Sequence, residues 1–140
     1  MRKYLLIALL IFIAGCTDKD QSVSGRWYTL TQIDNGAKIF NNNCASCHGN
    51  NAQGTTPKWK QPLADGSYPA PPLDGSAHAW HHPLKILQRT VKNGGIPLGG
   101  TMPPFKDKLN NKEINSVVAF FQSKWSNEIY EAWIKRGGLK

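Results

Sequence analysis

The stretch Cys44-Ala45-Ser46-Cys47-His48 decides the fold of this chain. If the stretch is helical, its two cysteines lie on roughly one face, with the histidine directly after the second. Two thiols so placed can form thioether bonds with the two vinyl groups of one haem, and the histidine can ligate the iron through Nε2. This spacing is the recognised signature of c-type haem attachment. We therefore expect one covalently bound haem c, held by Cys44, Cys47 and His48.

Two other uses of a cysteine pair fit this sequence less well. A thiol-disulfide oxidoreductase carries the pair in a thioredoxin-like βαβ context, which the surrounding sequence lacks. A zinc site needs further ligands, and no second cysteine pair stands at zinc-site spacing. Of the three cysteines in the chain, only Cys16 lies outside the motif. No structural disulfide is therefore expected.

The first 15 residues have the layout of a signal peptide. A basic start precedes an apolar run over residues 5–13, which is short for a helix that spans a bilayer. The small residues before Cys16 resemble the lipobox of bacterial lipoproteins. That resemblance implies cleavage before Cys16, acyl chains on this cysteine, and a lipid anchor on the periplasmic side of a bacterial membrane. An ordinary signal peptide cut near Ala14, or an uncleaved anchor, is the alternative.

The charge of the chain favours protein partners over nucleic acid. The formal net charge is +8 over 140 residues, and it falls to +6 when Arg2 and Lys3 leave with the signal peptide. The basic residues are spread out and form no dense stripe of the kind that binds nucleic acid. A bias of this size favours redox partners with acidic docking patches, or contact with anionic lipid headgroups. No small-molecule substrate is expected.

Apolar residues at helical spacing predict an all-α domain of three to five helices. The first helix is expected from about residue 33 to residue 42, and residues 26–33 are either an extended lead-in or the start of that helix. A second helix of about ten residues should begin at Pro83 and end at Gly94. A third should begin after Asn110, where Glu113 completes a capping box, and run to about Lys124. A further short helix begins after Ser126, or the third helix continues.

Long loops rich in proline and glycine separate these helices, over residues 49–82 and 96–108. Irregular segments of that length are unusual in a small domain unless they cover something, and a haem is large, flat and apolar. The second loop carries Met102, the only methionine besides Met1. A thioether is a soft ligand that favours ferrous iron, so Met102 is the expected sixth ligand, although a lone methionine can also fill a core.

The order of these features resembles a class I cytochrome c. Helix, C-x-x-C-H motif, proline-rich loop, helix, methionine loop and terminal helix follow one another over about residues 33–125. The resemblance implies an all-α cytochrome c fold wrapped around one haem. It also implies that Gly36 and Phe40 lie where the first helix crosses the last, with partners among three aromatic residues: Phe120, Phe121 and Trp125.

A second part of the resemblance concerns the axial histidine. Pro71-Pro72-Leu73 is similar to the family's Pro-x-Leu turn, whose proline carbonyl accepts a hydrogen bond from Nδ1 of that histidine. The resemblance therefore places Pro71 and Leu73 at the cofactor. Such a bond would set the orientation of the ring and tune the iron.

The chain departs from the compact members of the family around its remaining histidines and in its tail past residue 125. His78, His81 or His82 could replace Met102 as a ligand or bind a second metal, although a polar start of a helix with stacked rings is the simpler interpretation. A second question concerns two indoles: Trp59 and Trp80 could each donate to a haem propionate or simply pack.

Four segments and one function follow from these observations. We expect a signal peptide at 1–15, a lipidated tether and lead-in at 16–32, a cytochrome c domain at 33–125 and a helical extension at 126–140. The expected function is that of a periplasm-side carrier of single electrons between respiratory partners through His/Met-ligated iron, and not that of an enzyme. The alternatives are a haem-containing subunit of a larger oxidase or reductase complex, and a haem peroxidase or sensor.

Overall fold

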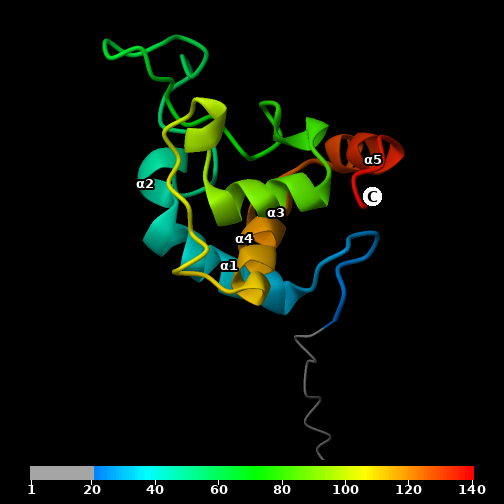
Figure 1. Cartoon of the computed structure of the whole chain (residues 1–140). Helices are drawn as coiled ribbons and strands as arrows, with labels where there is room; N and C mark the ends of the chain where they lie inside the picture. Colours follow the sequence, from blue (N-terminus) through cyan, green and yellow to red (C-terminus); the bar gives the residue numbers. More distant parts are fainter. Residues whose placement is uncertain (1–20) are drawn as a thin grey trace, which may run out of the picture.

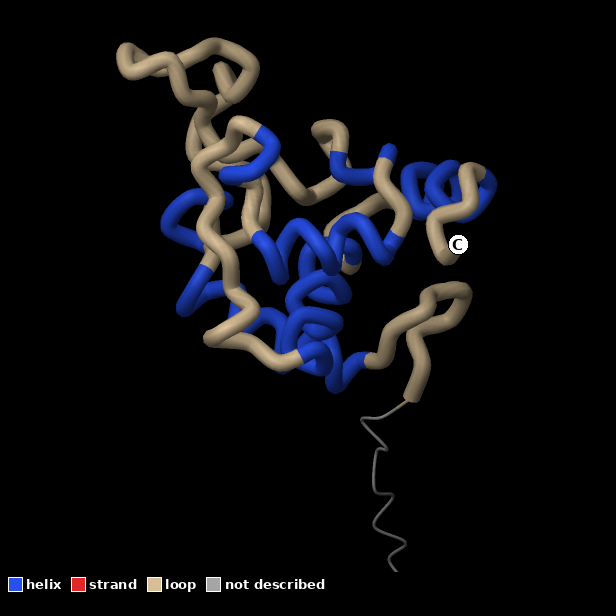
Figure 2. The backbone as a smooth tube through the Cα atoms, in the orientation of Figure 1, coloured by secondary structure: helices blue, strands red, loops and turns tan. Residues whose placement is uncertain are grey.

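A computed structural model of the chain describes residues 21–140. These residues form five α-helices and two short 3-10 helices, joined by long loops, and contain no strand beyond one isolated bridge between Ser22 and Thr29. This all-α architecture is the predicted one (Figures 1 and 2). The predicted signal peptide and Cys16 lie outside the described residues. The elements are α1 (Leu30–Asn43), α2 (Ala45–His48), η1 (Ala79–His81), α3 (Leu84–Asn93), η2 (Ile96–Leu98), α4 (Asn111–Gln122) and α5 (Asn127–Lys135).

The core is built on the crossing of α1 and α4 (Figure 1). Gly36 is buried, and a side chain added there would meet the backbone of Ser116. One turn further along α1, the ring of Phe40 lies 5.0 Å from the ring of Phe120, between centroids. The crossing at Gly36 and Phe40 therefore agrees with the prediction, and Phe120 is the aromatic partner among the three named.

The first helix begins within residues 26–33, the segment expected to be either a lead-in or the start of this helix. Thr29 accepts a hydrogen bond from the backbone N–H of Gln32, and the Gln32 side chain accepts one from the N–H of Thr29, which together form a capping box. Helix α1 therefore starts at Leu30. The residues before it pack on the domain, because Tyr28 is buried and its carbonyl accepts from the Val23 N–H at 3.0 Å.

The limits of α3 and α4 follow their predicted capping residues. Helix α3 begins after Pro83 and ends at Gly94, whose φ of 75° suits a residue without a side chain. Helix α4 begins after Asn110, whose side chain accepts from the N–H of Glu113, and it ends at Gln122 instead of residue 124. Ser126 then caps a separate helix, α5, so the tail is not a continuation of α4.

Helix α5 packs on the start of the described chain. Its two buried aromatic residues are Tyr130 and Trp133, and the Tyr130 ring lies 6.4 Å from that of Tyr28. The Arg26 guanidinium lies 4.0 Å from the centre of the Tyr130 ring, and the Tyr130 hydroxyl accepts from the Trp27 N–H at 3.1 Å. The two ends of the described chain thus share one core. Within residues 21–140, no helix has both the length and the apolar character needed to cross a bilayer.

Candidate haem site

The cysteine motif forms the short helix α2, which follows directly from α1. The backbone N–H of Cys44 donates to the Phe40 carbonyl at 2.8 Å, and the N–H of His48 donates to the Cys44 carbonyl at 2.9 Å. Cys44 and Cys47 are both free thiols, the first buried and the second exposed. Burial raises the pKa of the Cys44 thiol to about 11. Because neither thiol is part of a disulfide, both sulfurs are available for thioether bonds.

His48 is buried and held by a single contact from the proline-rich loop. Its Nδ1 lies 3.0 Å from the carbonyl oxygen of Pro71, the contact that the resemblance implies. A carbonyl can only accept, so Nδ1 carries the proton and Nε2 keeps its lone pair for a metal. Burial lowers the pKa of His48, although the bond to Pro71 opposes this shift. The ring is therefore presented as a neutral imidazole.

The Pro71–Leu73 turn is itself tied down at Leu73. The Leu73 N–H donates to the carbonyl of Ala52, and the Leu73 carbonyl accepts from the Trp125 indole N–H, both at 2.7 Å. Leu73 is half-buried and packs against the hydrophobic core. The sequence predicts Trp125 only as a helix-packing partner. No local pattern predicts its bond to Leu73, because the two residues are 52 positions apart in the chain.

Met102 lies on a loop that packs along the end of α3. Its carbonyl accepts from the Gly95 N–H at 2.9 Å, and a side chain at Gly94 would come within 2.6 Å of that carbonyl. The glycine pair therefore lets the loop approach the helix. The Met102 side chain is half-buried and packs against the core that also contains Cys44. Two free thiols, a neutral imidazole and a thioether form a donor set that fits haem c.

Comparison with known proteins gives the family. The model of the family described as cytochrome C oxidase, cbb3-type, subunit III matches residues 31–121. The chain belongs to this cytochrome c family. Its cofactor is accordingly one haem c, and its role lies in electron transport. The match includes the whole of α2, the Pro71 turn and Met102.

Three similar proteins show the range of the family. The cbb3-type cytochrome c oxidase subunit CcoP of Azospirillum sp. (strain B510) is 30% identical over 106 residues, which are 74% of this chain and 32% of CcoP. Cytochrome c6 of Bryopsis maxima is 31% identical over 63% of this chain and 86% of its own length. The cytochrome c subunit of the quinone alcohol dehydrogenase of Gluconobacter oxydans (strain 621H) is 30% identical over 66% of this chain and 18% of its own length.

Coverage differs among these relatives. The chain spans about a third of the length of the CcoP proteins that it matches, and most of the length of cytochrome c6. No solved structure matches the chain. The similarity therefore concerns the cytochrome c domain of the larger relatives and leaves the rest of those proteins unmatched.

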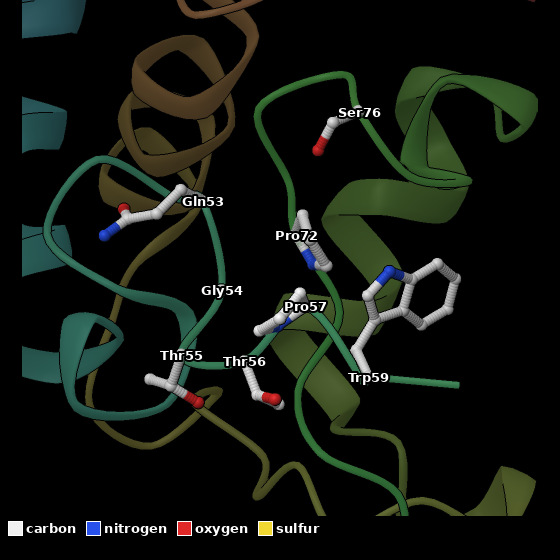
Figure 3. A pocket seen from close by; sticks show the side chains of 8 residues that line it. All are labelled: Gln53, Gly54, Thr55, Thr56, Pro57, Trp59, Pro72 and Ser76. Carbon is white, nitrogen blue, oxygen red and sulfur yellow. The ribbon is translucent and has the colours of Figure 1, made fainter. Parts of the chain in front are cut away.

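Two hollows in this cytochrome lie beside the Pro71 turn. The first, of about 420 Å³, is lined by Gln53, Gly54, Thr55, Thr56, Pro57, Trp59, Pro72 and Ser76 (Figure 3). The second, of about 390 Å³, is lined by Trp59, Lys60, Tyr68, Pro69, Pro71 and His78. Trp59 borders both hollows, and neither is lined by a cysteine, His48 or Met102.

The remaining histidines of the cytochrome lie against other rings. The His78 ring is tilted by 34° to the Trp59 ring, 5.5 Å away between centroids. His78 and His82 meet edge to face at 5.8 Å, and so do His81 and Trp80 at 4.2 Å. Across residues 21–140, no group of three or more histidine, cysteine, aspartate or glutamate residues could hold a metal ion. The rings are thus in contact, as expected, but two of the three contacts are edge to face and not stacked, and the arrangement gives no support to a second metal site. Donation by Trp59 or Trp80 to a haem propionate stays a prediction.

Proposed function

We propose that this cytochrome carries single electrons through one haem c, attached at Cys44 and Cys47 and ligated by His48 and Met102. When bound, the haem iron accepts and releases one electron between its ferric and ferrous states. The observation that carries the proposal is the geometry of His48. Its Nδ1 lies 3.0 Å from the Pro71 carbonyl oxygen, which leaves Nε2 available for the iron. The two free thiols precede this histidine in the same motif.

The protein's own residues set how the cofactor is held. Helix α2 and its N-terminal cap residue, Cys44, present both thiols and the imidazole from five consecutive residues, 44–48. The Pro71 carbonyl holds the ring in one tautomer, and such a bond raises the basicity of the ligand. Met102 supplies a soft sulfur, which favours the ferrous state. Two protein ligands would leave no open position on the iron, which argues for a carrier over a haem peroxidase or sensor.

An exposed basic face lies beside the segment that carries Met102. Helix α3 exposes one cation on each turn, and the loop after Met102 adds two more where the Lys106 N–H donates to the Lys92 carbonyl at 3.0 Å. We call this the α3 basic face, which consists of Lys85, Arg89, Lys92, Lys106 and Lys108. Four other cations, Arg26, Lys60, Lys124 and Arg136, lie over aromatic rings. The exposed cations near Met102 support redox partners with acidic docking patches.

The location of the carrier is part of the same proposal. The layout of residues 1–16 supports export followed by lipid attachment at Cys16, which would tether the domain to the periplasmic side of a bacterial membrane. Mass spectrometry of the mature N-terminus tests this directly. We expect an acylated Cys16, and a mature chain that begins elsewhere would contradict the anchor.

A second candidate function is that of a subunit in a larger complex. The similar CcoP proteins and the dehydrogenase cytochrome are named as subunits of an oxidase and a dehydrogenase. Purification from native membranes separates the two functions. Copurification with oxidase or reductase subunits at a fixed ratio would favour the subunit, whereas isolation as a single chain would favour the shuttle.

The iron ligands are tested on the oxidised, haem-loaded protein. We expect the charge-transfer band of a methionine sulfur bound to ferric iron, and its loss in Met102→Ala. Because three histidines are the other available ligands, a variant with His78, His81 and His82 all changed to Asn is the matched control, and it should keep the band. A band absent from the unsubstituted protein, or unaffected by Met102→Ala, would contradict the ligand assignment. Rapid peroxide turnover by the unsubstituted protein would instead favour the enzyme.

A further inference from the structure

We propose that Trp125 is a positioning residue for the axial histidine, and that it acts through the Pro71–Leu73 turn. The inference rests on the proposed role of His48 as an iron ligand. Trp125 is expected to touch neither the iron nor its ligands. Its indole N–H holds the backbone that in turn holds the His48 ring.

The connection is a short series of hydrogen bonds. The Trp125 indole donates to the Leu73 carbonyl at 2.7 Å. Two residues earlier in the same turn, the Pro71 carbonyl lies 3.0 Å from Nδ1 of His48. Because Pro71 and Pro72 have restricted backbone dihedrals, a shift at Leu73 is passed to the Pro71 carbonyl instead of being absorbed between them.

Few other hydrogen bonds hold the turn. Among the hydrogen bonds of residues 21–140, the carbonyls of Pro71 and Leu73 accept only from His48 and Trp125. The one remaining backbone bond of the turn is the Leu73 N–H to the Ala52 carbonyl. Loss of the indole N–H would therefore leave the Leu73 carbonyl unpaired and the turn held from one side.

The Trp125 ring is well placed to act as a fixed donor. Only 3% of Trp125 is exposed, and its ring lies 6.4 Å from Phe121 and 5.8 Å from Trp133. On the side of the turn, a Cβ at Gly75 would lie 3.2 Å from the indole, and the φ of +95° at Gly75 is one that other residues rarely adopt. The indole is thus packed on several sides, and its N–H direction is set by the core.

The expected consequence concerns the electron density of His48. A strong bond from Nδ1–H to a carbonyl raises the basicity of Nε2, which favours ferric iron. A looser turn would weaken that bond. The Nδ1 proton would then exchange faster with solvent, and the midpoint potential of the iron would move in the positive direction.

The test compares two Trp→Phe variants of the haem-loaded protein. Trp125→Phe removes the donor and keeps most of the ring. Trp133→Phe is the matched control, because Trp133 is 1% exposed and its indole donates to a different backbone carbonyl, that of His82, at 2.8 Å. NMR measures the exchange of the His48 Nδ1 proton with solvent. We expect this exchange to become about fivefold faster in Trp125→Phe, the factor that corresponds to the loss of one typical hydrogen bond.

The two readouts decide the proposal together. Trp125→Phe should also raise the midpoint potential. Trp133→Phe should change both quantities much less, because it keeps the Trp125 donor even though the two rings are neighbours. Unchanged exchange and potential in Trp125→Phe would overturn the proposal. Equal shifts in the two variants would also overturn it, because they would show a general loosening of the core.

A measurement on the unsubstituted protein covers the case in which Trp125→Phe fails to take up haem. If the indole holds the turn, the Trp125 indole proton and the His48 ring proton should exchange through the same opening. After correction for their different intrinsic rates, their opening free energies should then be equal throughout a denaturant series below unfolding. Different opening free energies would overturn the proposal. A failure of this proposal can be told apart from a failure of the proposed function. The paramagnetic shifts of the His48 ring report directly whether His48 binds the iron, whatever the role of Trp125.

Discussion

Gly36 of α1 lies against the backbone of Ser116 in α4, so that the two helices cross with no side chain between them. Only glycine allows this approach, because any Cβ at this position would overlap the Ser116 carbonyl group. The crossing also sets where Phe40 and Phe120 meet, 5.0 Å apart between ring centroids. Since α1 leads directly into α2, this crossing also positions the cysteine motif in space relative to α4.

Gly36→Ala should therefore destabilise the haem-loaded protein by about 3 kcal/mol, the upper part of the range for an overpacked core. The clash is with backbone, which cannot move aside as a flexible side chain can. Denaturant unfolding measures the change. The control is Asn35→Ala, an exposed neighbour on the same helix, for which a change within about 0.5 kcal/mol is expected. Equal stabilities of Gly36→Ala and the unsubstituted protein would contradict the close crossing.

Trp133→Ala should cost about 4 kcal/mol, because the side chain is 1% exposed and fills the space between α5 and the rest of the core. Its neighbour Ile134 is 41% exposed, so Ile134→Ala serves as the control and should change stability by less than about 1 kcal/mol. Thermal unfolding of both variants gives the comparison. Similar losses in the two variants would mean that α5 is not an integral part of the fold.

The loop around His78 should loosen in mild acid. Partial burial lowers the pKa of His78, and the nearby charges of His82, His81 and Lys60 lower it further. A histidine whose folded pKa is depressed contributes its stability fully above its unfolded pKa of 6.5, and this stability is lost as the pH falls below that value. Residues 57–70 include Trp59, whose ring lies against that of His78. Amide hydrogen exchange over these residues, corrected for intrinsic rates, should therefore show less protection below about pH 6.

His78→Asn provides the comparison for this pH dependence. The variant lacks the titrating group, so its protection over the same residues should change little across the same range. An identical acid response in both proteins would assign the effect to another group. The Met102 charge-transfer band, recorded in parallel, checks that the iron ligands stay in place.

Charge reversal on the α3 basic face should slow electron transfer to native membranes. The variant Lys85→Glu, Arg89→Glu and Lys92→Glu is compared with Lys38→Glu, Lys135→Glu and Lys140→Glu, which changes the net charge equally at exposed positions on other elements. We expect about a tenfold lower second-order rate for the first variant at low ionic strength, and a smaller difference as salt screens the charges. Equal rates for the two variants would exclude docking through α3.

The ends of the helices are features that local sequence patterns predict well. Gly94 and Asn110 were predicted as caps, and both are caps, because the preferences that select them act within one turn of the chain. The sequence left residues 26–33 open between a lead-in and the start of α1, although Thr29 and Gln32 carry the spacing of a capping box. That pattern was present in the sequence and would have placed the start correctly.

Other features of the fold have no local pattern. The choice of Phe120 over Phe121 and Trp125 as the partner of Phe40 depends on the angle at which α4 crosses α1. The pairing of Tyr28 with Tyr130 joins residues about one hundred positions apart, and it makes the predicted lead-in and tail parts of one core. Neither contact follows from spacing along the chain.

The sequence by itself determined which groups could hold the haem: two thiols and a histidine in one turn, and Met102 as the one methionine besides Met1. Those features are local or compositional, so they can be read without a fold. The family resemblance implied that Pro71 meets His48, and only the tertiary structure showed that this contact forms and that Trp125 donates to the same turn. The physical reason is that these bonds join distant segments, whose meeting depends on loop closure and on the burial of a shared core.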